Sequence, residues 1–455
     1  MMAPRSIFVL HSGGLGDLVL LGDFLASLRE SFPKARIALA CQAHLESVTR
    51  LYRQPVDEVV PLAVNPYSFS TPTGPLIERL RPVVEQLSAR RADLFVAAEV
   101  RPTWLDWLAG AALKAGRSVS TTPQPQQHGL VAALLEKFRL EPAVFEGPEV
   151  ARETHERARY EQLLRFLGGE PRLVHVKWNP PATEQAAAAR KLGELGIGSH
   201  RYLVCFPLGV PTTRVKRWPA ERFLDVLRQV RQQHSFAVLL TGARDEEQEL
   251  RGLAAALGDT GAPVGVFAGE PGELPLLAAL IANAVAYLGN DTGPMHLAQA
   301  YGVPGVAIFG GGGQWPCYAP WRPGSIGLVH PLPCFDCQWD CLFDHGLCVE
   351  SIPMEAVLEA VFDVIERPPP VPEVRTLARQ PAELLEWIAK ANARYREAQQ
   401  DRHARLEVLV EMQRAIDSRD RHIDRLQDLI AARPTGRLLR YFLRRAGIWR
   451  SRLPG

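Results

Sequence analysis

The feature that most constrains the fold is a regular alternation of short apolar segments and helical segments in the second half of the chain. Strands are predicted at 202–207, 237–241, 264–268, 286–289 and 306–309, and helices between them at 220–233, 246–257, 274–283 and 294–301. Strands joined by single helices predict right-handed crossovers and a parallel sheet. This half of the chain is therefore expected to form an α/β domain.

The first half carries the same pattern less completely. Residues 7–10 predict a short buried strand, 17–32 a helix that Pro33 ends, and 36–41 and 93–98 two further strands. We therefore predict an α/β protein with two facing Rossmann-like domains and a cleft between them. The expected boundaries are 1–180 and 200–366 for the domains, 367–381 for a Pro-rich linker and 382–455 for a helical extension.

The predicted extension contains two patterns of its own. Apolar residues recur every seven positions at Leu409, Ile416, Ile423 and Ile430, which indicates a short coiled-coil seam that could pair with another chain or pack on its own domain. After Asp428 the chain has no acid, and arginines alternate with aromatic and aliphatic residues. Such a basic amphipathic tail suits an anionic membrane surface, the alternatives being a solvated helix end or a disordered tail.

Composition narrows the class of protein. The 455 residues carry a formal net charge of +2 and seven cysteines, so neither nucleic-acid binding nor a secreted disulfide scaffold is indicated. The N-terminus runs directly into an apolar strand without a signal-peptide pattern, and the longest apolar run, 274–288, is too short to span a bilayer. We expect a cytoplasmic protein, peripheral on the inner membrane face if the tail binds lipid.

A polar turn follows the strand predicted at 286–289. Asp291 and Thr292 are residue types that cap helices, Gly293 lets a ligand approach the backbone, and Pro294 suits the first helical position. A helix that starts at the carboxyl end of a parallel strand favours a bound phosphate. His296 and the glycines at 310–313 follow closely, which favours a diphosphate site over a merely well-capped helix.

A second candidate for anion binding follows the strand at 202–207. Thr212 and Thr213 can donate hydrogen bonds to phosphate oxygens, and Lys216 can neutralise them, although basic residues before a helix can also form a solvated loop. After the next strand, Glu246 and Glu247 are candidates for holding ribose hydroxyls.

The N-terminal glycine loop, His11 to Asp17, opens the first predicted helix. It contains Gly14 and Gly16 but has Val19 where a dinucleotide loop has its third glycine, and Asp17 would repel a pyrophosphate. A carboxylate at a helix N-terminus that faces a cleft can bind a hydroxyl or accept a proton. The alternative is a first-turn acid that only complements the helix dipole.

Three motifs together resemble glycosyltransferase family 9, the heptosyltransferases. They are Gly14-Leu-Gly-Asp17, Lys216-Arg-Trp-Pro219 and Gly289-Asn-Asp-Thr-Gly-Pro-Met-His296, and the likeness spans about residues 5–365 in the family's order. The resemblance implies the GT-B fold and inverting sugar transfer from an ADP-heptose-type donor to a lipopolysaccharide-core or other lipid-linked glycan. The N-terminal domain would hold the acceptor and the C-terminal domain the nucleotide.

The resemblance also implies a role for each motif. Asp17 would be the general base, beside the acceptor-side glycines 14 and 16. Thr212, Thr213 and Lys216 would hold the diphosphate, and Glu246 or Glu247 the ribose. Asp291, Thr292, Gly293 and His296 would contact the donor's diphosphate and sugar, with no cofactor needed for catalysis.

Four cysteines, Cys334, Cys337, Cys341 and Cys348, cluster before the last predicted domain helix. In a reducing compartment this spacing suggests a structural zinc or iron site, with buried thiols or redox-labile disulfides as the alternatives. Similar cysteine-rich loops occur in many members of the family.

Two other functions remain open at this stage. The acceptor could be a protein, as for autotransporter-type glycosyltransferases of the same family. Alternatively, the body could be a catalytically degenerate scaffold that acts through its extension. The joint presence of Asp17, Lys216 and Asp291 favours an enzyme.

Overall fold

The computed structural model describes most of the chain up to residue 404. The residues outside the description are 1–2, 52–55, 69–73, 101, 123–127, 152, 177, 210–214, 259–260, 311–314, 335–336, 338–340, 342–345, 378–384, 387, 399, 402–403 and 405–455. The predicted heptad seam and the basic tail both lie outside the described residues. No helix of the described part is long and apolar enough to cross a bilayer.

The first domain is a parallel sheet in the order β3-β2-β1-β4-β5-β6. Its strands are β1 (Ser6–Leu10), β2 (Arg36–Gln42), β3 (Glu58–Leu62), β4 (Leu94–Ala97), β5 (Arg117–Ser120) and β6 (Phe145–Glu146). Its helices are α1 (Leu15–Ser31), α2 (Gly74–Ser88), α3 (Trp104–Leu113), α4 (His128–Phe138) and α5 (Glu156–Phe166), with 3₁₀ turns η1 (Ala43–Leu51) and η2 (Pro66–Ser68). Because both faces are covered, the central strands are apolar throughout.

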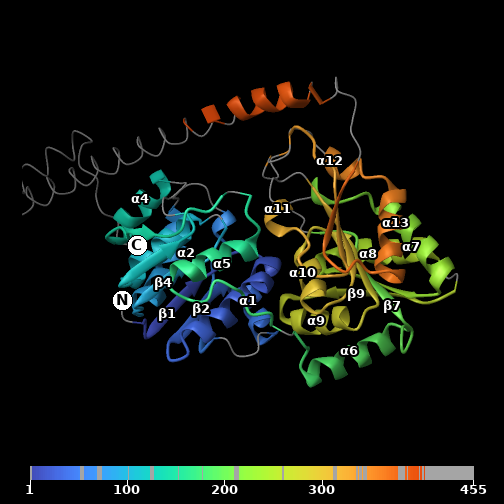
Figure 1. Cartoon of the computed structure of the whole chain (residues 1–455), viewed down its shortest axis with the longest axis horizontal. Helices are drawn as coiled ribbons and strands as arrows, with labels where there is room; N and C mark the ends of the chain where they lie inside the picture. The colour runs from blue at the N-terminus through green and yellow to red at the C-terminus, as the bar shows by residue number, and fades with distance from the viewer. Residues whose placement is uncertain are drawn as a thin grey trace, which may run out of the picture.

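The second domain is a parallel sheet in the order β13-β12-β11-β10-β7-β8-β9. Its strands are β7 (Tyr202–Phe206), β8 (Ala237–Ala243), β9 (Val264–Gly269), β10 (Ala286–Asn290), β11 (Gly305–Phe309), β12 (Ser325–Val329) and β13 (Glu373–Thr376). Its helices are α7 (Ala220–His234), α8 (Glu247–Leu257), α9 (Leu274–Ala282), α10 (Gly293–Ala300), α11 (Trp315–Tyr318), α12 (Leu347–Glu350) and α13 (Met354–Glu366), with 3₁₀ turns η4 (Arg244–Glu246) and η5 (Pro271–Glu273). Figure 1 shows the two α/β domains side by side.

This architecture confirms the predicted α/β class with two facing parallel-sheet domains. The strands and helices predicted for the second half each appear within three residues of the expected bounds. One segment differs from the expectation: residues 373–376, inside the predicted Pro-rich linker, form β13 and pair with β12 in register Ile326 to Glu373. An edge position tolerates the nearby prolines because one side of an edge strand needs no ladder hydrogen bonds.

The domains are joined through α6 (Ala182–Glu194), which packs on α9 of the second domain. They also meet directly, because α1 packs against α10, and one apolar cluster continues from Leu21 and Leu25 of α1 to Met295 and Leu297 of α10. Figure 1 shows α1 and α10 next to each other at the centre of the molecule. The ends of β1 and β10 therefore face a common space.

The described start of the extension packs back onto the second domain. Ile388 is fully buried against Leu332 and Cys334, and Asn392 Nδ2 donates a 3.4 Å hydrogen bond to Pro333 O. The choice between pairing with another chain and packing on its own domain concerns the heptad seam, which lies outside the described residues.

Candidate active site

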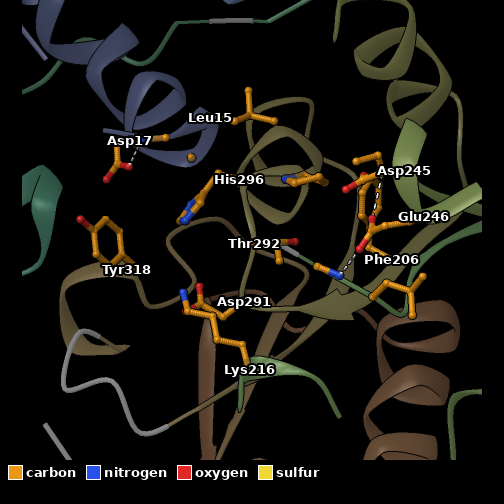
Figure 2. A pocket seen from close by; sticks show the side chains of 17 residues that line it. Leu15, Asp17, Phe206, Lys216, Asp245, Glu246, Asp291, Thr292, His296 and Tyr318 are labelled. Atoms are coloured by element: carbon orange, nitrogen blue, oxygen red, sulfur yellow. Dashed lines mark hydrogen bonds and ion pairs between the residues drawn. The ribbon is translucent and has the colours of Figure 1, made fainter. Parts of the chain in front are cut away.

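A cavity of about 560 Å³ lies between the two domains, within the usual size range of small-molecule sites. Figure 2 shows Asp17 and Tyr318 at one end, Asp245 and Glu246 at the other, and His296 between them. The lining residues come from α1, from the ends of β7, β8 and β10, and from α10 and α11: Gly14, Leu15, Gly16, Asp17, Phe206, Leu208, Gly209, Lys216, Ala243, Asp245, Glu246, Asp291, Thr292, Gly293, Pro294, His296 and Tyr318.

Asp17 occupies the third position of α1. Gly14 is the N-cap, and its N–H donates a 2.6 Å hydrogen bond to Asp17 Oδ2, so the carboxylate caps the first turn of α1 as well as facing the cavity. Burial raises the pKa of Asp17 and nearby Glu99 adds to this, while His11 and a hydrogen bond with Tyr318 act in the opposite direction. The two interpretations of Asp17, as helix-capping acid and as cleft carboxylate, are therefore compatible.

The two helix starts approach each other through glycines. A Cβ on Gly16 would lie 2.5 Å from His296 Cδ2, and a Cβ on Gly293 would lie 2.6 Å from Leu15 Cβ. These distances are too short for any other residue without movement. Gly16 and Gly293 therefore allow the first turn of α1 to reach the first turn of α10.

The N-terminus of α10 lines the same cavity. Thr292 is its N-cap and Pro294 stands in the first turn, as the sequence predicts. Asp291 Oδ2 lies 3.6 Å from Lys216 Nζ, and both side chains are mostly buried. Lys216 is thus held beside the helix start, where its charge and the helix dipole act on the same volume.

His296 is buried and uncharged at neutral pH. Burial, with smaller contributions from His155 and Lys216, lowers its pKa to about 3. Its Nδ1 has no hydrogen-bond partner among the described residues. A neutral imidazole at the cavity can exchange hydrogen bonds with a sugar hydroxyl, whereas it adds no positive charge to a diphosphate site.

At the other end of the cavity, the two predicted ribose candidates separate. Glu246 lines the cavity, where its Oε1 accepts hydrogen bonds from Gly209 N (3.1 Å) and Arg217 (2.9 Å). Glu247 is not among the described lining residues and pairs instead with Arg244 and Arg251. Asp245 also lines the cavity, and the sequence analysis did not predict it.

The predicted residues Thr212 and Thr213 and the four clustered cysteines are not among the described cavity lining. Thr212 and Thr213 are outside the described residues. Cys334 packs in the small apolar cluster below the extension, and burial, with the neighbouring Cys337 and Cys341, raises its pKa to about 11. In the described part of the chain no three His, Cys, Asp or Glu side chains are grouped as a metal would need. The metal site that the cysteine spacing suggests stays a prediction, because residues between these cysteines, His345 among them, lie outside the described part of the chain.

Sequence reasoning also missed Tyr318 and His11. Tyr318 comes from α11 of the second domain and lowers the pKa of Asp17 across the domain boundary. His11 directly follows β1, so its place at a strand end was the one available signal.

Two parallel α/β domains with a cavity between the ends of their strands are the arrangement of the GT-B fold. Comparisons with known proteins agree with this class. The family model for glycosyltransferase family 9 (heptosyltransferase) matches residues 159–338. A lipooligosaccharide heptosyltransferase 2 of Campylobacter jejuni is 32% identical over 154 residues, which cover 33% of this chain and 47% of that relative. Lipopolysaccharide heptosyltransferase 3 of Escherichia coli is 24% identical over 322 residues, which cover 69% of this chain and 84% of that relative.

Two solved structures support the fold. A family 9 glycosyltransferase from Veillonella parvula superposes with a TM-score of 0.57 at 20% identity, covering 79% of this chain and 97% of the other. The E. coli ADP-heptose lps heptosyltransferase II superposes with a TM-score of 0.56 at 19% identity, covering 79% and 98%. The chain is thus similar to the glycosyltransferase family 9 heptosyltransferases, in sequence over residues 159–338 and in fold over most of its length.

Proposed function

We propose that this protein is an inverting glycosyltransferase that moves a heptose or related sugar from an ADP-sugar to a hydroxyl of a lipopolysaccharide-core-type glycan. One observation carries the proposal: a carboxylate, Asp17, and a cation beside a helix start, Lys216 with α10, line the same interdomain cavity from different domains. The names of the relatives, which are lipooligosaccharide and lipopolysaccharide heptosyltransferases, support the donor and acceptor class.

The proposed chemistry needs no metal in any step. Asp17 removes the proton from the acceptor hydroxyl, whose oxygen attacks the anomeric carbon of the donor as the bond to the diphosphate breaks. Lys216 and the N-terminus of α10 stabilise the negative charge that develops on the leaving diphosphate. Attack from the side opposite the leaving group inverts the anomeric configuration. Thr212 and Thr213 stay proposed diphosphate ligands.

The remaining cavity residues suit the rest of the donor. Neutral His296 and Thr292 line the cavity and are the proposed hydrogen-bond partners of the transferred sugar. The carboxylates at the far end, Asp245 and Glu246, are the proposed partners of the ribose hydroxyls. Because Glu246 already accepts hydrogen bonds from Gly209 and Arg217, Asp245 is the better candidate for direct contact.

The location of the enzyme is a separate proposal from the sequence. The seven arginines between Arg433 and Arg452, interleaved with aromatic and aliphatic residues, suit attachment to an anionic inner membrane surface near a lipid-linked acceptor. Self-association through the heptad pattern remains a prediction for the same extension.

The donor proposal is tested by calorimetric titration of ADP, GDP and UDP into the wild type, Lys216→Ala and Lys191→Ala. Lys191 is a matched control because it pairs with Glu194 on α6, outside the described cavity lining. ADP should bind the wild type and the control equally and Lys216→Ala at least about tenfold more weakly. Preference for UDP or GDP would remove the ADP-sugar assignment, and absence of any nucleotide binding would favour a degenerate scaffold.

The catalytic proposal is tested with Asp17→Asn. The variant should retain ADP binding but lose about a hundredfold or more in transfer rate, because the amide cannot take the proton. Asp225→Asn on the exposed face of α7 is the control and should match the wild type. The wild type is then incubated with a lipid-linked glycan or with a polypeptide as acceptor. Mass spectrometry shows which of the two gains the mass of the transferred sugar.

A further inference from the structure

A buried ionic cluster lies behind Asp17. His11 follows β1, Glu99 follows β4 and Glu156 begins α5, and all three side chains are at most 5% exposed. His11 Nδ1 is 3.4 Å from Glu99 Oε1, and His11 Nε2 is 3.9 Å from Glu156 Oε1. The imidazole is thus flanked by a carboxylate at each nitrogen. Buried carboxylates are costly unless a positive charge or hydrogen bonds compensate them.

Gly13 brings this imidazole next to the Asp17 carboxyl group. A Cβ on Gly13 would lie 2.7 Å from Asp17 Cγ and 2.8 Å from His11 Cε1. Both groups therefore lie on the side of Gly13 where a side chain would project, and glycine leaves this space open. At such short range in a buried site, the charge on one group strongly affects the ionisation of the other.

The other ionisable groups that face the cluster are carboxyls and phenols. Glu99 accepts hydrogen bonds from Ser12 Oγ (2.8 Å) and Tyr67 OH (3.2 Å). Asp106 of α3 and Tyr160 of α5 face the same carboxylates, and Tyr318 reaches Asp17 from the second domain. The nearby His296 is neutral. Among the described groups packed around Glu99 and Glu156, His11 is therefore the candidate for a positive charge behind Asp17.

The pKa values follow this arrangement. Burial lowers the pKa of His11, but Glu99 and Glu156 outweigh burial and leave it well above the usual value. Burial raises the pKa of Glu99, yet the interaction with His11 outweighs this and lowers it.

We propose that His11 is a positioning residue that stays positively charged between Glu99 and Glu156 and thereby keeps Asp17 ionised. This inference rests on the proposed role of Asp17 as the base. Without the imidazolium, Asp17 would share a buried site with two carboxylates and would hold its proton at neutral pH. A protonated Asp17 cannot accept the acceptor's proton. The competing arrangement is a neutral ring whose Nδ1 accepts the N–H of Gly13, 3.2 Å away.

The charge on His11 can be measured without any substrate. Nuclear magnetic resonance of histidine-labelled protein, with the His11 signal assigned by its loss in His11→Gln, gives the titration of this ring. The signal should stay that of an imidazolium to above about pH 8. A ring that loses its proton near or below about pH 6.5 would be the neutral form and would overturn the proposal.

The effect on Asp17 is measured by the pH dependence of kcat/KM for the wild type, His11→Gln and His11→Lys. His11→Gln should move the acid limb upward by about one pH unit or more, which means a loss of roughly tenfold near pH 6.5 that is recovered near pH 9. His11→Lys keeps a positive charge and should return the limb toward its wild-type position. Equal losses in both variants at every pH would indicate a merely structural role and would refute the inference.

Asp17→Asn separates this inference from the proposed function. If Asp17→Asn retains full transfer, the assignment of the base is wrong. If it loses transfer while His11→Gln leaves the acid limb in place, the base assignment stands and the role of His11 fails.

Discussion

Asn290 at the end of β10 offers a sharp test of how the cavity is held together. The side chain is fully buried, and its Nδ2 donates to Pro207 O (3.0 Å) and Leu208 O (2.9 Å), while its Oδ1 accepts from Trp218 N (3.0 Å). Three hydrogen bonds thus tie β10 to the segments on both sides of the cavity residues Gly209 and Lys216. We expect Asn290→Ala to weaken both the domain and the site.

The expected magnitude follows from these contacts. Each hydrogen bond contributes about 1 kcal/mol net, so the three together contribute about 3 kcal/mol to the free energy of unfolding. The truncation also leaves three buried backbone groups without these partners, which raises the expected loss to roughly 3–5 kcal/mol. The hydrogen bond from Trp218 N to Asn290 fixes the backbone two residues after Lys216. Without this bond the position of Lys216 would be less well defined, so ADP affinity should fall by at least about tenfold.

Urea denaturation followed by tryptophan fluorescence gives the loss of stability, and calorimetry gives the loss of ADP affinity. Asn283→Ala is the control, because its Nδ2 makes a single 2.9 Å hydrogen bond to Ala279 O at the end of α9, for an expected loss of about 1 kcal/mol. If Asn290→Ala costs no more than Asn283→Ala, or leaves ADP affinity unchanged, the argument that Asn290 holds the cavity is refuted.

Two further predictions concern packing and pH. Gly16→Ala would place its Cβ 2.5 Å from His296, so the rate of sugar transfer in a steady-state assay should fall at least about tenfold. Gly252→Ala is the control, because a Cβ at this position meets open space. This control should keep full activity, and its free energy of unfolding in urea should rise by up to about 1 kcal/mol. Burial, with Glu99, raises the pKa of Asp106 to about 7, so the folded protein binds this proton more tightly than the unfolded chain and loses that stabilisation as pH rises from about 4 to about 7. Asp106→Asn should therefore flatten the fall of Tm over this range, and an unchanged profile would exclude Asp106 as its source.

The sequence predicted the fold wherever segments with strand-like apolar runs alternate with segments of helical periodicity. In the second domain the elements from β7 to β11 were predicted, because these strands are mostly apolar and helices α7 to α10 have Pro or a polar residue at the N-cap. Strand β12 was not predicted. Strand β13 was missed, because Glu373 to Thr376 is short, half-polar and preceded by prolines, and it becomes a strand only by pairing with β12. The domain boundaries and the nature of the distal extension remain predictions.

For the site, the sequence by itself indicated which segments follow strand ends, and these contain Asp17, Lys216 and the turn 291–296. Such segments can be recognised locally, because the signals that start a helix are residues only three or four positions apart. Only the tertiary structure decided which residues meet. It placed Tyr318 of one domain on Asp17 of the other, selected Glu246 over Glu247 for the cavity, and brought Glu99 and Glu156 to His11. These contacts join residues far apart in the chain, and no local pattern encodes them, since they arise where ends of neighbouring parallel strands and the start of a covering helix converge.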